Sequence, residues 1–291
     1  MTGELAAIAA AFFWAFSSVI YARVGERIAP LPLNFGKGIV AIALILITLA
    51  LRDRLVPEMA ASAAGWLVLS GVIGIGIGDT AFFAALNRIG PRRALLFDTL
   101  TPPLTALLAF LFLQEKLSGT AWIGILLTLL GVAWVISERT TVVSGDRARA
   151  WWGVGFGSIA VLAQANGVVI SRAVLVDTEI MPLWSSLVRL LAGTLVLPLV
   201  WGMRRESVQW KPMLSLKALG AIALASCFGT YLGIWLQQTA LKFAPAGIAQ
   251  TIIATSPLFV LPFSASMGER ISTRAILGVV VSLVGVALLF G

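Results

Sequence analysis

Long apolar segments, separated by short charged ones, run through the whole chain. A helix needs about 20 apolar residues to cross the hydrocarbon core of a bilayer, and only helices and closed barrels satisfy their backbone polar groups there. The strict alternation of apolar and polar positions that a barrel strand requires is absent. The pattern therefore predicts an all-α integral membrane protein with ten transmembrane helices. We expect them at 4–23, 32–51, 65–87, 92–113, 119–137, 152–172, 182–201, 215–241, 246–266 and 273–290.

The two halves of the chain repeat one another. Two prolines and one glutamate recur at a fixed offset of 154 residues: Pro91 and Pro245, Pro103 and Pro257, and Glu115 and Glu269. A charged segment between the halves, at 138–150, is typical of a linker. The chain is therefore predicted to consist of an N-terminal five-helix repeat at 1–137, this linker, and a C-terminal five-helix repeat at 151–291. Because five is odd, the second repeat enters the membrane from the opposite side. The repeats are therefore inverted, a recurrent construction of transporters.

Composition narrows the class of protein further. The chain is 59% hydrophobic and 12% charged, with a mean hydropathy of +0.98. The net charge of +8 comes from Lys and Arg in the gaps between apolar segments, so we expect a lipid bilayer as partner and no nucleic acid. One cysteine, Cys227, and no histidine leave no set of metal ligands, so we expect no metal and no cofactor. We expect a multi-pass protein of a bacterial inner (plasma) membrane. The distribution of Lys and Arg places both termini outside.

Short motifs recur in the same order in both halves. In the first they are Gly74 to Gly78, Ala85-Leu86, Pro91, Thr101-Pro102-Pro103, Glu115-Lys116 and Gly131-Val132-Ala133. In the second they are Gly229 to Gly233, Ala240-Leu241, Pro245, Thr255-Ser256-Pro257, Glu269-Arg270 and Gly285-Val286-Ala287. This order resembles the drug/metabolite transporter superfamily, specifically its ten-helix EamA-type members. The resemblance implies an exporter of small metabolites, commonly amino acids, with a central cavity between the repeats. It also implies cytoplasmic termini, the opposite of the charge distribution.

Charged side chains inside a membrane are costly, at about 2.5–3.5 kcal/mol each near the middle of a helix, and are candidates for function. Four fall inside predicted helices: Lys37, Asp79, Asp98 and Arg189. Asp79 lies roughly 13 Å from the nearer end of its helix, too deep for its short side chain to reach the interface. It either faces an aqueous cavity, binding a cationic group or a coupling proton, or forms a structural pair. Asp98 follows Arg92 and Arg93, so its position fits a local ion pair as well as it fits a binding site.

Lys37 and Arg189 occupy equivalent places, each seven residues after a proline that leads its helix, Pro30 or Pro182. The functional reading is attraction of a substrate carboxylate from opposite sides of the cavity. Both residues lie only about 8–11 Å below the interface, however, and long basic side chains can snorkel to it. Anchoring at the interface therefore stays open as the alternative.

Amides have no reason to face lipid, so four of them are expected to point inward: Gln164, Asn166, Gln237 and Gln238. Tyr231, Trp235 and Gln238 are spaced by three or four residues and share one face of the eighth helix. Trp14 lies on a similar face of the first helix. Aromatic rings beside amides suit an amphipathic organic solute, which makes Trp14, Gln164, Tyr231, Trp235 and Gln238 candidate binding residues, with interfacial anchoring as the alternative for rings near helix ends.

Glycine and proline positions suggest how the helices pack and move. Four glycines permit close helix contact in the Gly-xxx-Gly manner: Gly74, Gly78, Gly229 and Gly233. Four prolines fall within spanning helices, where each removes a backbone hydrogen bond and favours a kink that could gate the cavity: Pro102, Pro103, Pro257 and Pro262. Glu115 and Glu269 are expected to be structural ties at helix ends.

These features predict a secondary transporter that exports amino acids or related small metabolites by alternating access. No phosphate-binding loop and no catalytic cluster is present, so neither a primary pump nor an enzyme with catalytic residues is expected. The alternatives within transport are a carrier of lipophilic cations or drugs, or of nucleotide sugars. A channel is a further alternative. We expect the chain to act as a monomer.

Overall fold

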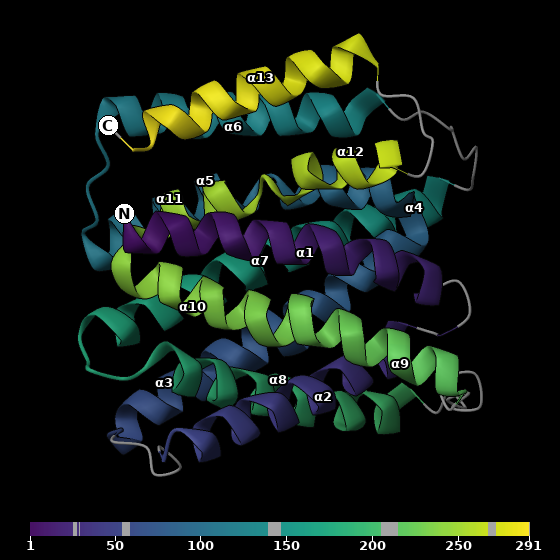
Figure 1. The fold of residues 1–291 in the computed structure, drawn as a ribbon, viewed down its shortest axis with the longest axis vertical. Helices are drawn as coiled ribbons and strands as arrows, with labels where there is room; N and C mark the ends of the chain where they lie inside the picture. The colour runs from purple at the N-terminus through teal and green to yellow at the C-terminus, as the bar shows by residue number, and fades with distance from the viewer. Residues whose placement is uncertain are drawn as a thin grey trace.

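The computed structural model describes residues 1–25, 28, 30–53, 59–138, 147–204, 215–266 and 272–290, which are helical with no strand among them (Figure 1). Seven of the described helices are long and apolar enough to cross a bilayer. Three shorter apolar helices, Thr101–Leu113, Ala246–Val260 and Thr273–Leu288, complete the ten predicted spans. The first half of the chain forms α1 (Thr2–Gly25), α2 (Pro30–Leu51), α3 (Ala61–Gly71), η1 (Val72–Asp79), α4 (Thr80–Asp98), α5 (Thr101–Leu113) and α6 (Gly119–Glu138).

The second half forms the corresponding set of helices. They are α7 (Arg147–Val176), α8 (Pro182–Arg204), α9 (Leu216–Ala225), η3 (Ser226–Leu232), α10 (Gly233–Phe243), α11 (Ala246–Ile253), α12 (Ser256–Ser266) and α13 (Thr273–Leu288). Because α7 already begins at Arg147, it includes the last residues of the expected linker at 138–150. Residues 139–146 of that linker lie outside the described part of the chain.

One boundary differs from the sequence prediction. We expected the third span to end at 87 and the fourth to begin at 92, but α4 is one continuous element that belongs to both. Gly153 on α7 faces Arg88 and Ile89, whereas Gly157, one turn further along α7, faces Phe97. The chain approaches the start of α7 up to Ile89 and has moved away from it again by Phe97, so its direction reverses between these two residues, within α4. The glycines on α7 leave room for the approaching and the departing part of α4.

The equivalent point in the second half is an open break. The backbone of Ala244 is extended, with φ −133° and ψ 151°, and α11 begins two residues later. This conformation is expected because the ring of Pro245 disfavours the helical region for the residue before it.

The two repeats pack mainly against each other. Helix α1 lies against the third and fourth spans of the second repeat, α9 to α12, and its equivalent α7 lies against the third and fourth spans of the first repeat, α3 to α5. Each repeat therefore contributes helices to the interior of the other, and a central space between them is lined by both.

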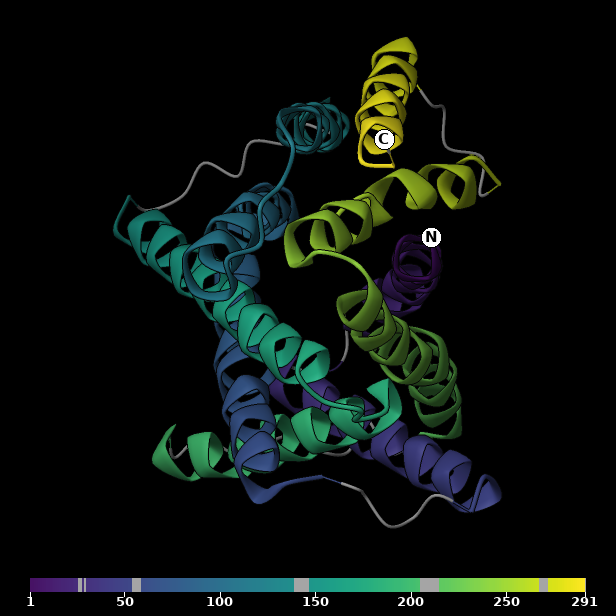
Figure 2. The same cartoon turned by 90° about the vertical axis from the view of Figure 1, so that its left-hand side faces the viewer.

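The last helices of the repeats, α6 and α13, form an antiparallel pair at one edge of the molecule (Figures 1 and 2). Each is preceded by a serine whose side chain accepts a hydrogen bond from the backbone N–H three residues on, Ser118 before α6 and Ser272 before α13. In the middle, Ser282 Oγ donates to the carbonyl of Thr128 at 3.0 Å, and Thr128 Oγ1 lies 3.5 Å from the carbonyl of Ser282. These two residues are 154 apart, so repeat-equivalent positions meet across a local two-fold axis. The antiparallel pairing is what inverted repeats require.

Each repeat also contains a π-helical segment at the same place in its third span, η1 in one and η3 in the other. Such segments are rare and often lie at functional sites. η1 contains both Gly74 and Gly78, whereas η3 contains Gly229 and is followed directly by Gly233, so the wider turns coincide with the predicted Gly-xxx-Gly positions.

Candidate functional site

Both repeats have a helix break at an equivalent position. The chain is non-helical between α4, which ends at Asp98, and α5, which begins at Thr101, and again between Ile253 and Ser256. We expected Pro102, Pro103 and Pro257 to kink continuous helices. Instead they occupy the first turn of α5 or α12, where a missing backbone N–H breaks no intrahelical bond. Pro262 does lie inside α12.

A cavity of about 140 Å³ lies between these two breaks. Its lining comes from both repeats and includes the predicted residues Trp14 and Gln164. The remaining lining residues are Asp98, Thr99, Thr101, Pro102, Val132, Ile136, Val168, Gln237, Gln250, Ile253, Ala254, Ser256 and Pro257. Discontinuous helices that meet at mid-membrane commonly form the solute and ion sites of secondary transporters, because their ends expose unpaired backbone groups. The cavity has this architecture.

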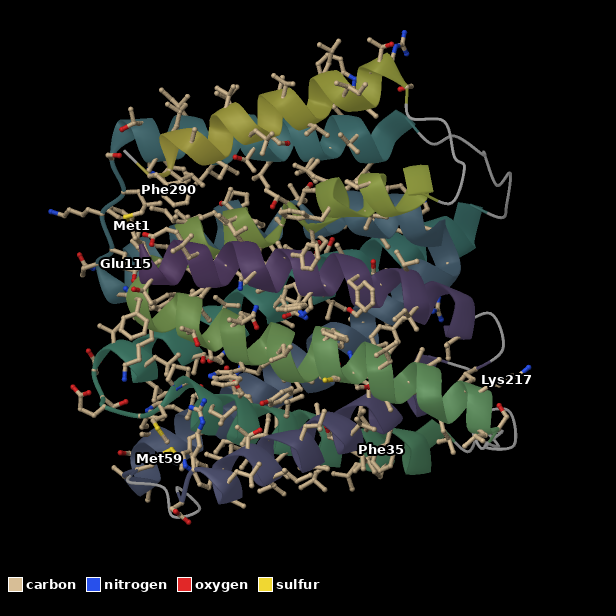
Figure 3. The ribbon with its side chains drawn as sticks, in the orientation of Figure 1. Met1, Phe35, Met59, Glu115, Lys217 and Phe290 are labelled. Carbon is tan, nitrogen blue, oxygen red and sulfur yellow. The ribbon has the colours of Figure 1, made fainter. Side chains whose placement is uncertain are left out.

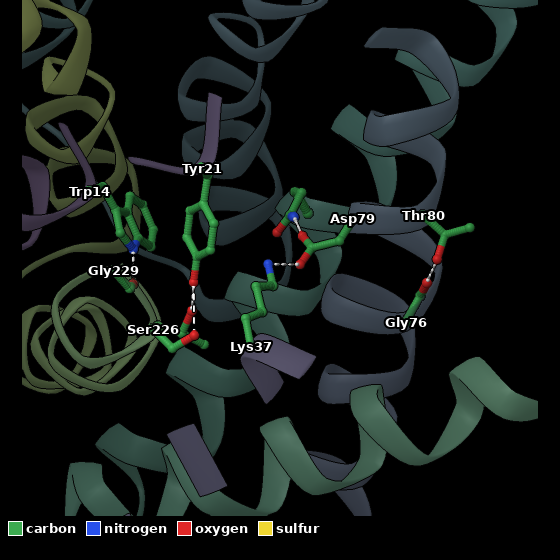
Figure 4. Close-up of polar contacts among 10 residues, drawn as sticks. Trp14, Tyr21, Lys37, Gly76, Asp79, Thr80, Ser226 and Gly229 are labelled. Carbon is green, nitrogen blue, oxygen red and sulfur yellow. Dashed lines mark hydrogen bonds and ion pairs between the residues drawn. The ribbon is translucent and has the colours of Figure 1, made fainter. Parts of the chain in front are cut away.

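Gln164 connects the cavity to a charged cluster. Its Nε2 donates to Asp79 Oδ1 at 2.8 Å, and Lys37 Nζ lies 3.4 Å from the other carboxylate oxygen (Figure 4). The Lys37 and Asp79 side chains are 18% and 23% exposed, so the ion pair is largely shielded. Gly78 makes this arrangement possible, because a Cβ there would lie 3.3 Å from Gln164 Cγ.

Arg189 joins the same cluster from α8. It is 2% exposed, and Asp79 acts on it by Coulomb attraction. A Cβ on Gly74 would lie 3.4 Å from Arg189 Nη2, so the guanidinium passes over the glycine face of η1. Its Nε and Nη1 have no hydrogen-bond partner within the described part of the chain. The snorkelling alternative does not apply, because a buried side chain does not reach the interface.

Trp14 and Tyr21 of α1 meet the π segment of the second repeat (Figure 4). Trp14 Nε1 donates to the carbonyl of Gly229 at 2.6 Å, and its ring occupies the space that a side chain at Gly233 would need. The hydroxyl of Tyr21 lies 3.0 Å from Ser226 Oγ. Thus Gly74 and Gly78 of η1 face the charged cluster, whereas Gly233, directly after η3, faces an indole that lines the cavity.

Besides the charged cluster, three predicted binding residues lie outside the cavity lining: Tyr231, Trp235 and Gln238. Tyr231 shares a hydrogen bond with Thr48 at 2.8 Å, and its ring centroid is 5.9 Å from that of Trp235. The Arg52 guanidinium lies 5.3 Å from the centroid of the Trp235 ring. These contacts belong to an apolar cluster between α2 and α8.

Gln238 is fully buried between α7 and α8. Its Oε1 accepts hydrogen bonds from Ser171 and from Ser185, the latter at 2.9 Å. It therefore ties three helices together at a point outside the cavity lining.

Sequence reasoning gave no site role to Gln250 and left Asp98 open between an ion pair and a site, yet both line the cavity. Gln250 is 6% exposed, and its Nε2 lacks a hydrogen-bond partner among the described residues. The sequence does indicate an inward-facing Gln250, because the argument that predicts Gln164 to point inward applies to any amide in an apolar span. The side chains of Arg92 and Arg93, the partners considered for Asp98, lie outside the described side chains.

A second polar network closes one end of the bundle, the end at which the chain begins (Figure 3). Glu115 pairs with Arg172 at 2.6 Å and accepts the backbone N–H of Ala246, the first residue of α11, at 2.9 Å. Arg172 in turn donates to the carbonyls of Leu241 and Lys242 near the end of α10, at 2.6 and 3.0 Å. These two side chains therefore bridge the open break between α10 and α11. The repeat equivalent of Glu115, Glu269, lies outside the described residues.

Comparison with known proteins agrees with this architecture. The model of the EamA-like transporter family matches residues 1–137 and 151–291. An "uncharacterized transporter" of Archaeoglobus fulgidus is 26% identical over 287 residues, 98% of this chain and 96% of the relative. The uncharacterized transporters YwfM and YyaM of Bacillus subtilis are 24% and 25% identical, over 97% and 86% of this chain and 91% and 80% of theirs. A solved crystal structure with 16% sequence identity superposes with a TM-score of 0.80, covering 99% of this chain and 96% of that one, which shows a shared fold.

Proposed function

We propose a substrate class and a mechanism for this chain, which belongs to the EamA-like transporter family. It is a multi-pass integral membrane protein and a transporter of small molecules, as its family and its relatives are. The proposal is that it exports amino acids or related small metabolites by alternating access.

One observation carries the proposal: the cavity lies between equivalent helix breaks of two inverted repeats and is lined by both. When inverted repeats exchange conformations, the side to which a site between them opens changes as well. The size of the cavity also favours small solutes. At about 140 Å³ it is smaller than the roughly 300–1,000 Å³ of pockets for drug-sized ligands, which disfavours drugs and nucleotide sugars as substrates.

The charged cluster beside the cavity supports a solute that bears a carboxylate. It holds two basic side chains, Lys37 and Arg189, and one acidic one, Asp79. Arg189 has hydrogen-bond donors without partners among the described residues, and a guanidinium matches the geometry of a carboxylate. In this mechanism Lys37 and Arg189 attract the carboxylate, while Asp79 takes an amine or a coupling proton.

The test is uptake of a panel of radiolabelled amino acids into proteoliposomes, with and without a pH gradient. We expect saturable uptake of at least one amino acid, lowered about tenfold or more when Lys37→Ala and Asp79→Asn are combined. Lys217→Ala, an exposed basic residue at the start of α9, is the matched control and should leave uptake unchanged. Unchanged uptake by the double variant would show that the charged cluster does not bind the solute. Absence of saturable uptake for every amino acid would exclude amino acids as the substrate class.

A further inference from the structure

We propose that Asp98 binds the primary ammonium group of the solute inside the cavity between the helix breaks. This inference rests on the proposed transport function and refines it, since it assigns the amine to Asp98 rather than to Asp79. Asp98 is the one charged side chain among the described residues that line the cavity, and the residue as a whole is exposed. Its Oδ1 lies 3.3 Å from the hydroxyl of Thr101, which holds the carboxylate at the break.

The two acids in the membrane-spanning helices, Asp79 and Asp98, differ in how much hydrogen-bonding capacity remains. Asp79 has one oxygen bonded to Gln164 and the other paired with Lys37, so a solute amine would have to displace a charged partner. Asp98 has one hydroxyl partner among the described residues and retains accessible surface. A carboxylate offers about four lone-pair sites, so capacity for an ammonium group remains at Asp98.

The helix ends around the cavity also favour a cation. Helix α4 ends at Asp98, and the last carbonyls of a helix carry partial negative charge. The opposing N-terminus of α5 would ordinarily offer unpaired N–H groups. Pro102 and Pro103 in its first turn have none, so this terminus offers fewer donors than a helix start usually does.

Gln250 supplies an independent indication of a ligand. Its side chain is 94% buried, lines the cavity and has an Nε2 that meets no acceptor among the described residues. A buried amide donor without a partner costs free energy unless a ligand satisfies it. A solute with an ammonium group on Asp98 and a hydrogen-bond acceptor near Gln250 would satisfy both residues.

The experiment measures binding of n-butylammonium, a probe that carries the ammonium group and no carboxylate, to the purified full-length protein by isothermal titration calorimetry. We expect wild type to bind it and Asp98→Asn to bind it about tenfold or more weakly, since a charge-assisted hydrogen bond is lost. Asp98→Glu keeps the charge and should retain most of the affinity. Asp177→Asn, an exposed acid after α7, is the matched control and should bind as wild type does.

Three results would overturn the assignment: no binding to wild type, equal binding to wild type and Asp98→Asn, or an Asp98→Glu variant as weak as Asp98→Asn. If Asp98→Asn removes only the pH dependence of uptake and leaves probe binding intact, Asp98 carries a proton and the ammonium assignment is wrong. Binding does not require transport. Failure of the amino-acid uptake experiment and failure of this one are therefore distinguishable.

Discussion

The seam between α6 and α13 should tolerate no additional carbon atom at its centre. A Cβ added to Gly131 would lie 2.5 Å from the carbonyl oxygen of Gly278 and 2.6 Å from the backbone nitrogen of Ser282. Backbone atoms cannot rotate away as a side chain can, so the helices must separate. Overpacking of this kind costs about 1–3 kcal/mol. Separation would also stretch the hydrogen bond between Ser282 and Thr128.

The matched control is Gly155→Ala on α7, where an added Cβ meets no atom within 4 Å. Replacing a helical glycine by alanine gains up to about 1 kcal/mol at either position, so that gain cancels when the two variants are compared. We therefore expect the free energy of unfolding of Gly131→Ala to be about 1–3 kcal/mol lower than that of Gly155→Ala. Titration with sodium dodecyl sulfate, followed by far-ultraviolet circular dichroism in mixed micelles, measures it. A difference below about 0.5 kcal/mol would refute the close approach at the seam.

Two further predictions concern polar ties outside the cavity. Glu115→Gln should lower the free energy of unfolding by about 1–3 kcal/mol in the same titration, because it leaves the mostly buried Arg172 without its charged partner. An unchanged free energy of unfolding would show that the ion pair does not stabilise the fold. Ser171→Ala should lower the free energy of unfolding by only about 0.6 kcal/mol, the average for hydrogen bonds between membrane helices, because Gln238 still accepts a hydrogen bond from Ser185. A loss above about 1.7 kcal/mol would contradict this prediction and indicate a wider hydrogen-bond network.

The sequence predicts the fold well because lipid imposes a simple rule on each helix. Apolar length alone locates the ten spans, and the odd number of helices per repeat requires the inversion that the antiparallel α6 and α13 display. The same rule explains why Trp14 and Gln164 point inward and line the cavity, since an amide or an indole N–H in an apolar span needs a partner inside the protein.

The rest of the site depends on contacts that helical periodicity does not determine. Tyr231, Trp235 and Gln238 do face inward, but their neighbours are α2, α7 and α8 rather than the cavity. A stripe specifies one face of a helix and not the element opposite it. The first residue of this stripe, Tyr231, lies in the π segment η3, where the number of residues per turn changes, so helical spacing does not extrapolate from it to Trp235 and Gln238. Arg189 is buried because α8 crosses η1 at glycines, a contact between distant segments.

Alternating access requires some contacts to persist while others break, and two of the contacts between the repeats differ in this respect. The α6–α13 seam joins equivalent residues, as Thr128 meets Ser282, so exchanging the conformations of the repeats reproduces the same contacts. The tie at Glu115 joins the end of α5 to non-equivalent elements, Arg172 on α7 and the start of α11. An exchange of conformations therefore changes the tie at Glu115 and leaves the seam intact. In the proposed mechanism the seam is accordingly the fixed axis, and the Glu115–Arg172 pair must open for the cavity to reach that end of the bundle.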